Sequence, residues 1–385
     1  MRMTQLKTIA DIQTGPFGSQ LHKEDYVETG TPIVTVEHLG NRVFTEQNLP
    51  RVSDSDKARL IKYTLSTGDI VFSRVGSVDR CSYVDKSHDG WMFSGRCLRV
   101  RPTELVDSLY LYYYFCLEET KQFVRNIAVG ATMPSINTKL LGEVEIALPD
   151  LNNQKRIAAV LSSLDDKIEN NQKLNDNLQQ QAMALYAEMF LNSSDNNVTS
   201  GTLSDIAAIT MGQSPSGSSY NEDGVGEVFY QGRAEFGFRF PKRRLFTTEP
   251  KRMAETGDVL LSVRAPVGDL NVAYERCCIG RGLGAIHSKT GHSSFVLYTM
   301  FALRSQLDVF NGEGTVFGSI NRDALNAIPI DIPPVTEIDQ FEAVAHPIDE
   351  LIRANYEENC RLEAIRDSLL PKLMSGEIDV SAVQL

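Results

Sequence analysis

Basic side chains recur at matched places along this chain. Arg96 lies in "SGRCLRV" at 94–100 and Arg281 in "IGRGLGAI" at 279–286, each directly after a glycine. Two further arginines each follow an apolar Gly-Asp segment, one position out of register with each other. Arginine and lysine contact phosphates and read guanine in the major groove, so these residues are candidates for DNA contact. With the basic run at 242–244, the candidates are Arg74, Arg96, Lys242, Arg243, Arg244, Arg264 and Arg281.

A solvated charged face explains any single one of these residues equally well. Recurrence at the same place raises Arg96 and Arg281 above that baseline. The alternative for this pair is a structural role, in which each arginine pairs with a carboxylate inside its own domain.

Signals for catalysis are missing from the sequence. It contains no GxxxxGK[ST], HExxH or GxSxG motif and no Asn/Asp-Pro-Pro-aromatic motif. "GRGLG" at 280–284 resembles a nucleotide-binding glycine loop, but the matching "GRCLR" at 95–99 lacks the later glycines. The spacing of Cys277, Cys278, His287 and His292 fits no familiar zinc pattern. We expect a non-catalytic chain that holds no metal and no cofactor of its own.

The candidates lie in a module that the chain repeats. "GATMPSINTKLLGEVEIALP" at 130–149 recurs 184 positions later as "GTVFGSINRDALNAIPIDIP" at 314–333. Earlier matches occur in the same order in both halves, at offsets that fall from 197 through 189 and 185. Short β-rich runs bounded by glycine and proline predict strands and turns in each copy. Self-similarity at a long offset therefore predicts two copies of one fold.

One amphipathic helix is expected in each copy, at 108–127 and at 293–312. The first contains a row of tyrosines at 112–114, which could form a platform for base stacking. Tyr113 and Tyr114 align with Thr299 and Met300, and the helical spacing favours a place in the core instead.

A long helix with a heptad pattern follows each copy, starting near Gln154 and near Asp339. Asparagines recur at the same two seam positions, with Asn171 and Asn175 matched by Asn355 and Asn359. Buried seam asparagines fix register and orientation. In an antiparallel pair, Asn171 meets Asn359 and Asn175 meets Asn355.

The alternative is that these asparagines are solvated positions on separate surface helices. Pro347 and Pro371 fall inside the second helix and predict a break or kink at both places.

Charge and cysteine content limit the partners and the cellular location that the sequence allows. The net charge is −12, but residues 336–385 carry 4 basic against 11 acidic residues, while the two copies are near neutral. A basic face on each copy therefore remains possible, and the acidic last helix is expected to face protein. Six cysteines without CxxC spacing predict reduced thiols. The sequence contains no stretch of about 18 apolar residues, so it predicts no membrane helix. We expect a cytoplasmic protein.

This layout resembles the specificity subunit of type I restriction-modification systems. The resemblance covers essentially the whole chain, and its most specific piece is "LNNQKRIAAVLSSLDDKIENNQKLNDNL". It implies an α+β fold with two homologous target recognition domains, each a mixed β-sheet with helices. Two long antiparallel helices would join them as a coiled coil with pseudo-two-fold symmetry. The implied segments are domain 1 at 1–150, a spacer helix at 151–191, domain 2 at 192–335 and a second spacer helix at 336–385.

The resemblance also implies partners. Two methyltransferase subunits would dock on the helices and bring S-adenosylmethionine, and restriction subunits could add an ATP-dependent nuclease. Double-stranded DNA would be read as a bipartite, asymmetric target. Two rival readings stay open, namely a modification-only system and a coiled-coil adaptor that binds protein rather than DNA.

Overall fold

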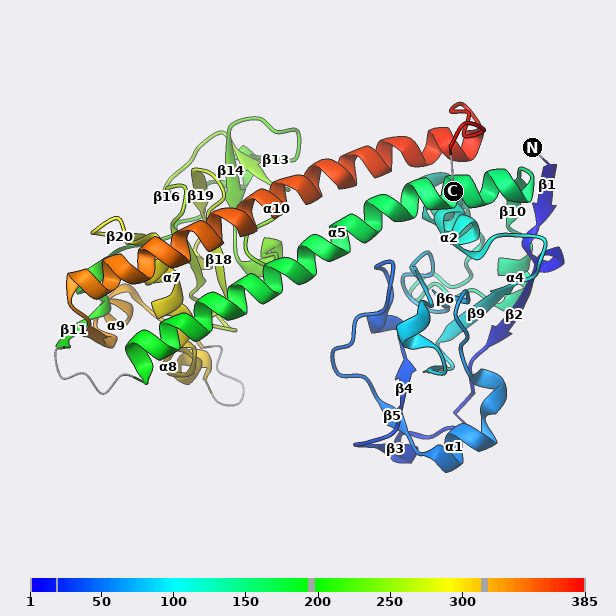
Figure 1. Cartoon of the computed structure of the whole chain (residues 1–385), viewed down its shortest axis with the longest axis horizontal. Coiled ribbons are helices and arrows are strands. Elements are labelled where there is room, and N and C mark those ends of the chain that lie inside the picture. The colour runs from blue at the N-terminus through cyan, green and yellow to red at the C-terminus, as the bar shows by residue number, and fades with distance from the viewer. Residues whose placement is uncertain (1, 19, 193–197, 313–317, 384–385) are drawn as a thin grey trace. The chain divides into compact units, whose positions relative to one another are not determined.

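The computed structural model describes residues 2–18, 20–192, 198–312 and 318–383. The chain divides into two compact units, of which unit 1 contains Met1–Asn170 and Glu358–Leu385 and unit 2 contains Asn171–Glu357. Each unit thus holds one globular module and a segment of both long helices, α5 (Leu151–Tyr186) and α10 (Val335–Ser375) (Figure 1). Below, module 1 denotes residues 1–150 and module 2 denotes residues 192–335.

Two sheets form the body of module 1. The first is antiparallel, in the order β2-β9-β6-β7, and joins β2 (Ala10–Thr14), β6 (Ile70–Ser73), β7 (Cys81–Tyr83) and β9 (Cys97–Pro102). The second has the order β3-β5-β4-β8, from β3 (Tyr26–Val27), β4 (Thr31–Val34), β5 (Arg51–Val52) and β8 (Met92–Phe93). The short helix α1 (Asp54–Arg59) follows β5.

Module 2 repeats this arrangement with one more strand, β16, in its second sheet. Its antiparallel sheet has the order β12-β20-β17-β18, from β12 (Ala207–Met211), β17 (Val259–Ser262), β18 (Leu270–Val272) and β20 (Leu283–Ser288). The other sheet has the order β13-β15-β14-β19-β16, from β13 (Tyr220–Asn221), β14 (Glu227–Tyr230), β15 (Phe246–Thr247), β16 (Met253–Ala254) and β19 (Cys277–Ile279). The predicted repeat is therefore confirmed at the level of strand order.

The apolar run after each Gly-Asp pair is a strand buried on both faces. In β6, Ile70 and Phe72 belong to one core cluster while Val71 belongs to another. In β17, Leu261 and Leu260 divide between two clusters in the same way. A strand with two buried faces needs apolar residues at successive positions, which is why these runs do not alternate.

The Gly-Asp pair itself forms a turn. Gly68 and Gly257 have φ of +93° and +88°, a conformation that residues with a side chain rarely adopt. The carboxylate of Asp69 accepts the Ser66 backbone N–H at 2.7 Å, and that of Asp258 accepts the Glu255 backbone N–H at 2.8 Å. The motif therefore recurs because the turn geometry recurs.

Each repeated "SIN" segment caps a short helix. Asn137 precedes α4 (Thr138–Gly142) and accepts the Leu140 backbone N–H at 2.9 Å. Asn321 precedes α9 (Arg322–Asn326) and accepts the Ala324 backbone N–H at 2.9 Å. Both helices lead into strands that close two-stranded ribbons, β1 (Arg2–Gln5) with β10 (Glu145–Leu148) and β11 (Thr199–Thr202) with β21 (Pro329–Ile332). The one-turn helix α6 (Leu203–Ile206) follows β11.

The single helix predicted in each module is wrong, because the structure has two. Module 1 contains α2 (Ser108–Cys116) and α3 (Glu118–Ile127), separated at Leu117, whose ψ of 133° is extended. Module 2 contains α7 (Ser293–Ala302) and α8 (Arg304–Asp308), followed by a 3-10 turn at Val309–Asn311. Helix α2 is buried nearly all round and α3 only along one side, so the two pieces meet different surroundings.

The tyrosine row lies in the core of unit 1, as the helical spacing predicts. Tyr112, Tyr113 and Tyr114 are 6%, 2% and 9% exposed. A base-stacking platform needs open ring faces, so these residues do not form one.

The long helices pair antiparallel within each unit. In unit 1, Arg366 of α10 binds Asp165 of α5 at 2.8 Å, and Lys167 lies 3.1 Å from Glu358. In unit 2, Asn355 donates a hydrogen bond to Asn175 at 2.8 Å, which is the pair that the antiparallel arrangement requires. The four seam asparagines, Asn171, Asn175, Asn355 and Asn359, are 3% to 8% exposed, so they are not solvated positions. A turn of π-helix at Ala187–Leu191 follows α5.

The predicted break at the two prolines is wrong. Pro347 and Pro371 both lie inside α10, which is assigned as one helix from Val335 to Ser375. Both prolines are exposed, so water can solvate the carbonyl groups that lose their helical partner.

No helix in the described part of the chain is both long enough and apolar enough to span a membrane. The six cysteines are free thiols, and burial raises the pKa of Cys97 and of Cys277 to about 12.

Alanine at Asn137 or Asn321 removes the oxygen that caps α4 or α9. We expect each substitution to lower the free energy of unfolding by about 1 kcal/mol, measured by urea denaturation followed by circular dichroism. Lys139→Ala, an exposed change inside α4, is the control and should shift it by less than about 0.5 kcal/mol. An equal loss in the control would show that any substitution at this short helix, rather than loss of the cap, lowers stability.

Candidate nucleic-acid interface

The two arginines occupy equivalent turns but not equivalent positions. The Arg74 backbone N–H donates to Arg96 O and the Val263 backbone N–H donates to Gly282 O, and Cys97 and Leu283 are likewise equivalent, so Arg281 corresponds to Gly95. The alignment of Arg96 with Arg281 predicted from the sequence is therefore wrong by one residue. Arg96 lies between β8 and β9, and Arg281 lies between β19 and β20. The glycine before each is required by close packing, since a Cβ at Gly95 would lie 2.4 Å from the Pro16 carbonyl oxygen and one at Gly280 would lie 2.9 Å from Gln231 Cα. In each turn, therefore, a closely packed glycine precedes an arginine that is exposed.

Both arginine side chains point to solvent. Arg96 and Arg281 are exposed, and neither forms an ion pair with a carboxylate in the residues that the structure describes. The alternative, in which each arginine pairs with a carboxylate of its own domain, is therefore not found among the described residues. The charge of Arg96 acts on Tyr26, opposing the effect of burial, which raises the pKa of that phenol. An unpaired guanidinium at a turn is available to a phosphate or a base edge.

Arg74 and Arg264 are not equivalent residues. The Arg74 backbone N–H donates to Arg96 O at 2.8 Å, and in module 2 the same bond is made by Val263 to Gly282 O at 2.9 Å. Arg264 instead forms a β-bridge with Ser319, as Val75 does with Ser135. The shift of one position seen in the sequence therefore places the two arginines on opposite faces of the extended backbone.

Module 1 places Arg74, whose backbone N–H is bonded to Arg96 O, beside an aromatic ring that is not among the candidates from the sequence. The Arg74 guanidinium donates to Gly95 O at 3.1 Å and lies 5.4 Å from the centre of the Phe17 ring. Phe17 is 53% exposed, in the segment "GPFG" at 15–18 after β2. The signal in the sequence was an aromatic residue flanked by proline and glycine.

The basic run of module 2 is partly neutralised. Arg243 forms an ion pair with Glu275, and Arg244 pairs with Glu235 at 2.5 Å and with Glu222 at 3.3 Å. The hydrogen bond to Glu235 raises the pKa of Arg244.

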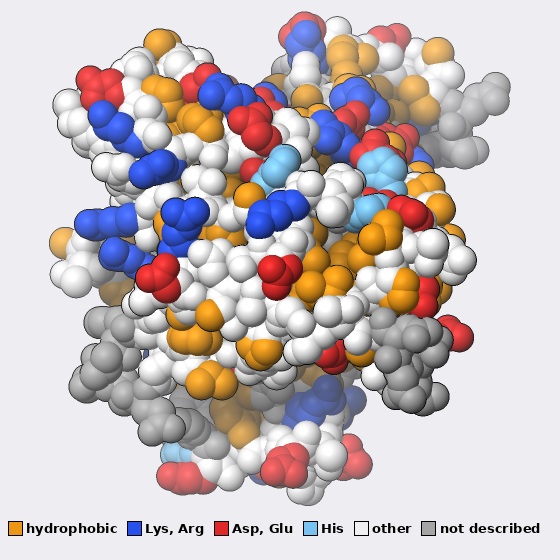
Figure 2. All heavy atoms as spheres, turned by 90° about the vertical axis from the view of Figure 1, so that its left-hand side faces the viewer, with side chains coloured by type: hydrophobic (Ala, Val, Ile, Leu, Met, Phe, Trp, Pro, Cys, Tyr) orange, Lys and Arg blue, Asp and Glu red, His pale blue; other side chains and the backbone are white. Residues whose placement is uncertain are grey.

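Lys242 is exposed, and its backbone N–H donates to Glu235 O. No hydrogen bond among the described residues joins this run to Arg264 or Arg281. Figure 2 shows Lys and Arg side chains interspersed with Asp and Glu on the face that includes α9 and β11.

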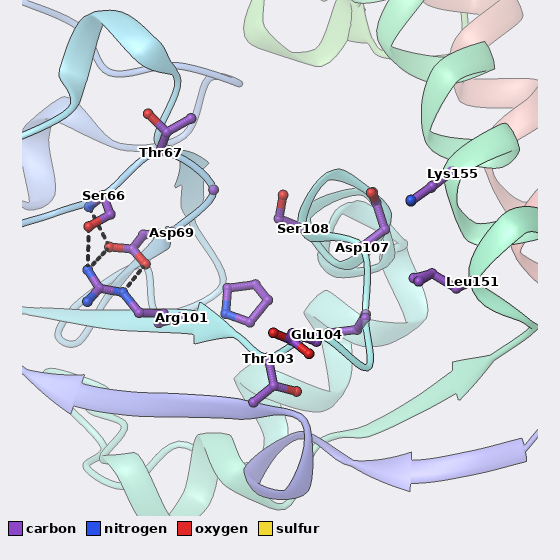
Figure 3. Close-up of a pocket in the computed structure, with 13 residues that line it drawn as sticks. Ser66, Thr67, Asp69, Arg101, Thr103, Glu104, Asp107, Ser108, Leu151 and Lys155 are labelled. Atoms are coloured by element: carbon purple, nitrogen blue, oxygen red, sulfur yellow. Dashed lines mark hydrogen bonds and ion pairs between the residues drawn. The ribbon is translucent and has the colours of Figure 1, made fainter. Parts of the chain in front are cut away.

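A polar hollow of about 460 Å³ lies in unit 1, away from the seven candidate residues (Figure 3). Asp69 and Arg101 line it and bind each other at 2.7 Å, and hydroxyl groups of Ser66, Thr67 and Ser108 complete much of the lining. Arg101 is already neutralised by Asp69 and is not available to a phosphate, whereas Lys155 also lines the hollow.

The histidines and cysteines of module 2 do not assemble a metal site. His287 pairs with Asp258 at 2.6 Å and His292 pairs with Asp339 at 2.8 Å, while Cys277 is buried in β19. The described residues contain no group of three or more side chains suited to hold a metal ion.

Comparisons with known proteins agree with this architecture. Residues 1–180 and 196–357 match the family described as type I restriction modification DNA specificity domain. A protein of Methanocaldococcus jannaschii named "Putative type I restriction enzyme MjaX specificity subunit" is 29% identical over 98% of this chain and 93% of its own length. The MjaIX specificity subunit of the same organism is 26% identical over 72% of this chain and 71% of its own length.

A solved structure shows the same fold. The S subunit of a type I restriction-modification system from M. genitalium superposes with a TM-score of 0.58 at 18% identity, over 97% of this chain and 95% of that chain. With the family matched in both halves, the resemblance stated from the sequence is confirmed. The chain belongs to the family of type I restriction-modification DNA specificity subunits.

Proposed function

We propose that this chain is a non-catalytic DNA specificity subunit that reads a bipartite, asymmetric target through modules 1 and 2. The observation that carries the proposal is the pair of equivalent turns in which Arg96 and Arg281 are exposed and unpaired within the described residues. Two readers in one chain contact two half-sites, as two protomers of a dimeric reader do. The division of the chain into four segments, with boundaries after residues 150, 191 and 335, is part of this proposal.

Divergence between the modules supports an asymmetric target. At the same bridge position, module 1 has Val75 and module 2 has Arg264. In the loop after the first sheet strand, module 1 presents the exposed Phe17, whereas module 2 has "GQSPS" at 212–216. Different side chains at equivalent backbone positions offer different contacts to the base edges.

The helices are proposed to scaffold two methyltransferase subunits, which would bring S-adenosylmethionine, and restriction subunits where the system has them. In unit 2, Val344 and Leu351 lie seven residues apart on α10 and are 51% and 44% exposed. Seven-residue spacing keeps both on one side of the helix, outside the seam with α5. Apolar groups at that spacing fit the apolar side of a partner helix.

The rival reading is a coiled-coil adaptor whose modules bind protein. It fits the net charge of −12, but it gives no reason for two exposed arginines at equivalent turns. A modification-only system would use the same chain, and the presence of a restriction subunit in the host separates it from a full restriction system.

The methylation pattern tests the proposal directly. Co-expression with the methyltransferase subunit of its own host, followed by single-molecule sequencing of host DNA, should reveal methylated adenines in a two-part motif with a fixed gap. Omitting this chain is the control and should abolish the motif. A complex that forms with the methyltransferase but methylates no motif would favour the adaptor.

Arg281→Ala tests the contact residues. We expect weaker DNA binding by the complex and a salt slope smaller by about one, because one phosphate contact is lost. Arg243→Ala is the matched control, since Arg243 is already paired with Glu275 and should alter the slope less. Affinity is measured by fluorescence anisotropy over a series of salt concentrations. Equal slopes for Arg281→Ala and the unmodified chain would remove Arg281 from the interface.

Leu351→Glu tests the scaffold. A charge on this exposed position should weaken assembly with the methyltransferase by about tenfold or more, the scale of an interface anchor, while the chain stays folded. Val309→Glu changes a more exposed apolar residue of module 2, 80% exposed, and should leave assembly intact. Size-exclusion chromatography of the mixed subunits gives the result, and normal assembly of the Leu351 variant would contradict this docking side.

A further inference from the structure

Unit 1 contains a polar anchor between module 1 and the helix that follows it. The Tyr113 hydroxyl on α2 donates to Asp165 of α5 at 2.6 Å. Arg42, from the loop before β5, binds Asp166 at 2.6 Å and lies 3.6 Å from Glu169. Tyr113 and Asp165 are 2% and 6% exposed.

A corresponding anchor occurs in unit 2, where the arginine binds the same carboxylate as the tyrosine rather than the carboxylate next to it. The Tyr298 hydroxyl on α7 donates to Asp349 of α10 at 2.9 Å, and Arg239 binds the same carboxylate at 2.6 Å. The Arg239 guanidinium also lies 5.8 Å from the centre of the Tyr298 ring. The side chain of Arg239 is 4% exposed, so its charge is almost fully removed from water.

Backbone contacts show that the two arginines are equivalent. The Tyr83 backbone N–H donates to Arg42 O at 2.7 Å, and the Val272 backbone N–H donates to Arg239 O at 2.8 Å. The backbone of each arginine is therefore hydrogen-bonded to the edge strand of its antiparallel sheet, β7 or β18.

The tyrosines and carboxylates are equivalent as well. Asp165 and Asp349 are separated by the same 184 positions as the seam asparagines. The predicted alignment of Tyr113 with Thr299 is wrong by one residue, because Tyr298 makes the bond that Tyr113 makes.

Each anchor also reaches the opposite helix of the pair. In unit 1, Arg366 of α10 donates to Asp165 at 2.8 Å. In unit 2, Arg239 donates to Gln179 of α5 at 3.0 Å. The third partner differs between the copies, but in both the polar group joins the module, its own helix and the opposing helix.

A buried charged group is costly unless it is paired, and apolar packing alone could attach a module to a helix. Hydrogen bonds between charged groups add what apolar packing lacks, namely a defined direction. A duplicated set of such bonds at the module base, in which Tyr113, Asp165 and Arg239 are buried, therefore points to orientation as its role.

We infer that the Arg-Tyr-Asp anchor of each unit sets the orientation of its reader on the helix, and through it the gap between the two half-sites. This inference rests on the proposed function. DNA completes a turn in about 10 base pairs, so each added base pair rotates a half-site by about a tenth of a turn. A reader held firmly on its helix accepts one gap, whereas a reader free to tilt accepts neighbouring gaps.

The test uses the complex of the full chain with its methyltransferase. Targets carry the native half-sites with the native gap or with a gap one base pair longer or shorter. Tyr113→Phe removes only the hydroxyl bond to Asp165, and we expect preference for the native gap to fall about tenfold, the effect of one hydrogen bond to a charged group. Asp166→Asn, at an exposed position, should act in the same direction without endangering folding.

Tyr110→Phe is the matched control. Tyr110 lies on the same helix, is 0% exposed, and donates its hydroxyl to Ala147 O at 2.6 Å inside module 1. It should lower stability as Tyr113→Phe does and leave the gap preference unchanged. An unchanged gap preference in both Tyr113→Phe and Asp166→Asn overturns the inference, as does an equal loss in Tyr110→Phe. Absence of any two-part target for the unmodified chain would instead contradict the proposed function.

Discussion

The antiparallel pairing of α5 with α10 is the constraint on which both units depend. In unit 1, Ile157 and Leu161 of α5 share one core cluster with Leu370, Leu373 and Met374 of α10. In unit 2, Ala182 and Tyr186 of α5 share a cluster with Phe341 and Ala345 of α10. Each module therefore completes its core only when helix segments far apart in sequence come together. Burial of this apolar surface is the dominant favourable term in folding, so neither module is independent of the pair.

Within that frame, most of the repeated sequence serves the fold rather than recognition. Gly68 and Asp69 shape a turn, Asn137 caps a helix, and Gly15 permits two backbones to approach closely. These roles need particular residue types, so both copies retain them. Surface positions such as Val75 and its equivalent Arg264 carry no such requirement and differ between the modules. A shared scaffold with divergent surface residues is the arrangement that two different half-sites call for.

Basic residues of the same type differ in whether a carboxylate already pairs with them. Arg96 and Arg281 are exposed without an ion pair in the described part of the chain, whereas Arg243 and Arg244 are engaged by glutamates. Arg239, equally basic in sequence, is buried against the helices. A guanidinium has the same charge in all three settings, and its neighbours decide whether it can bind a phosphate.

The sequence by itself determined the features that depend on local residues and their period: the duplication, the heptad seam with its asparagines, and the absence of catalytic motifs. Tertiary structure alone decided that the module helix divides at Leu117, that exposed Pro347 leaves α10 unbroken, and that Tyr298 rather than Thr299 matches Tyr113. It also decided that Arg42 and Arg239 anchor the modules. The physical reason is that these outcomes depend on burial and on partners more than 50 positions away, which a local pattern does not contain.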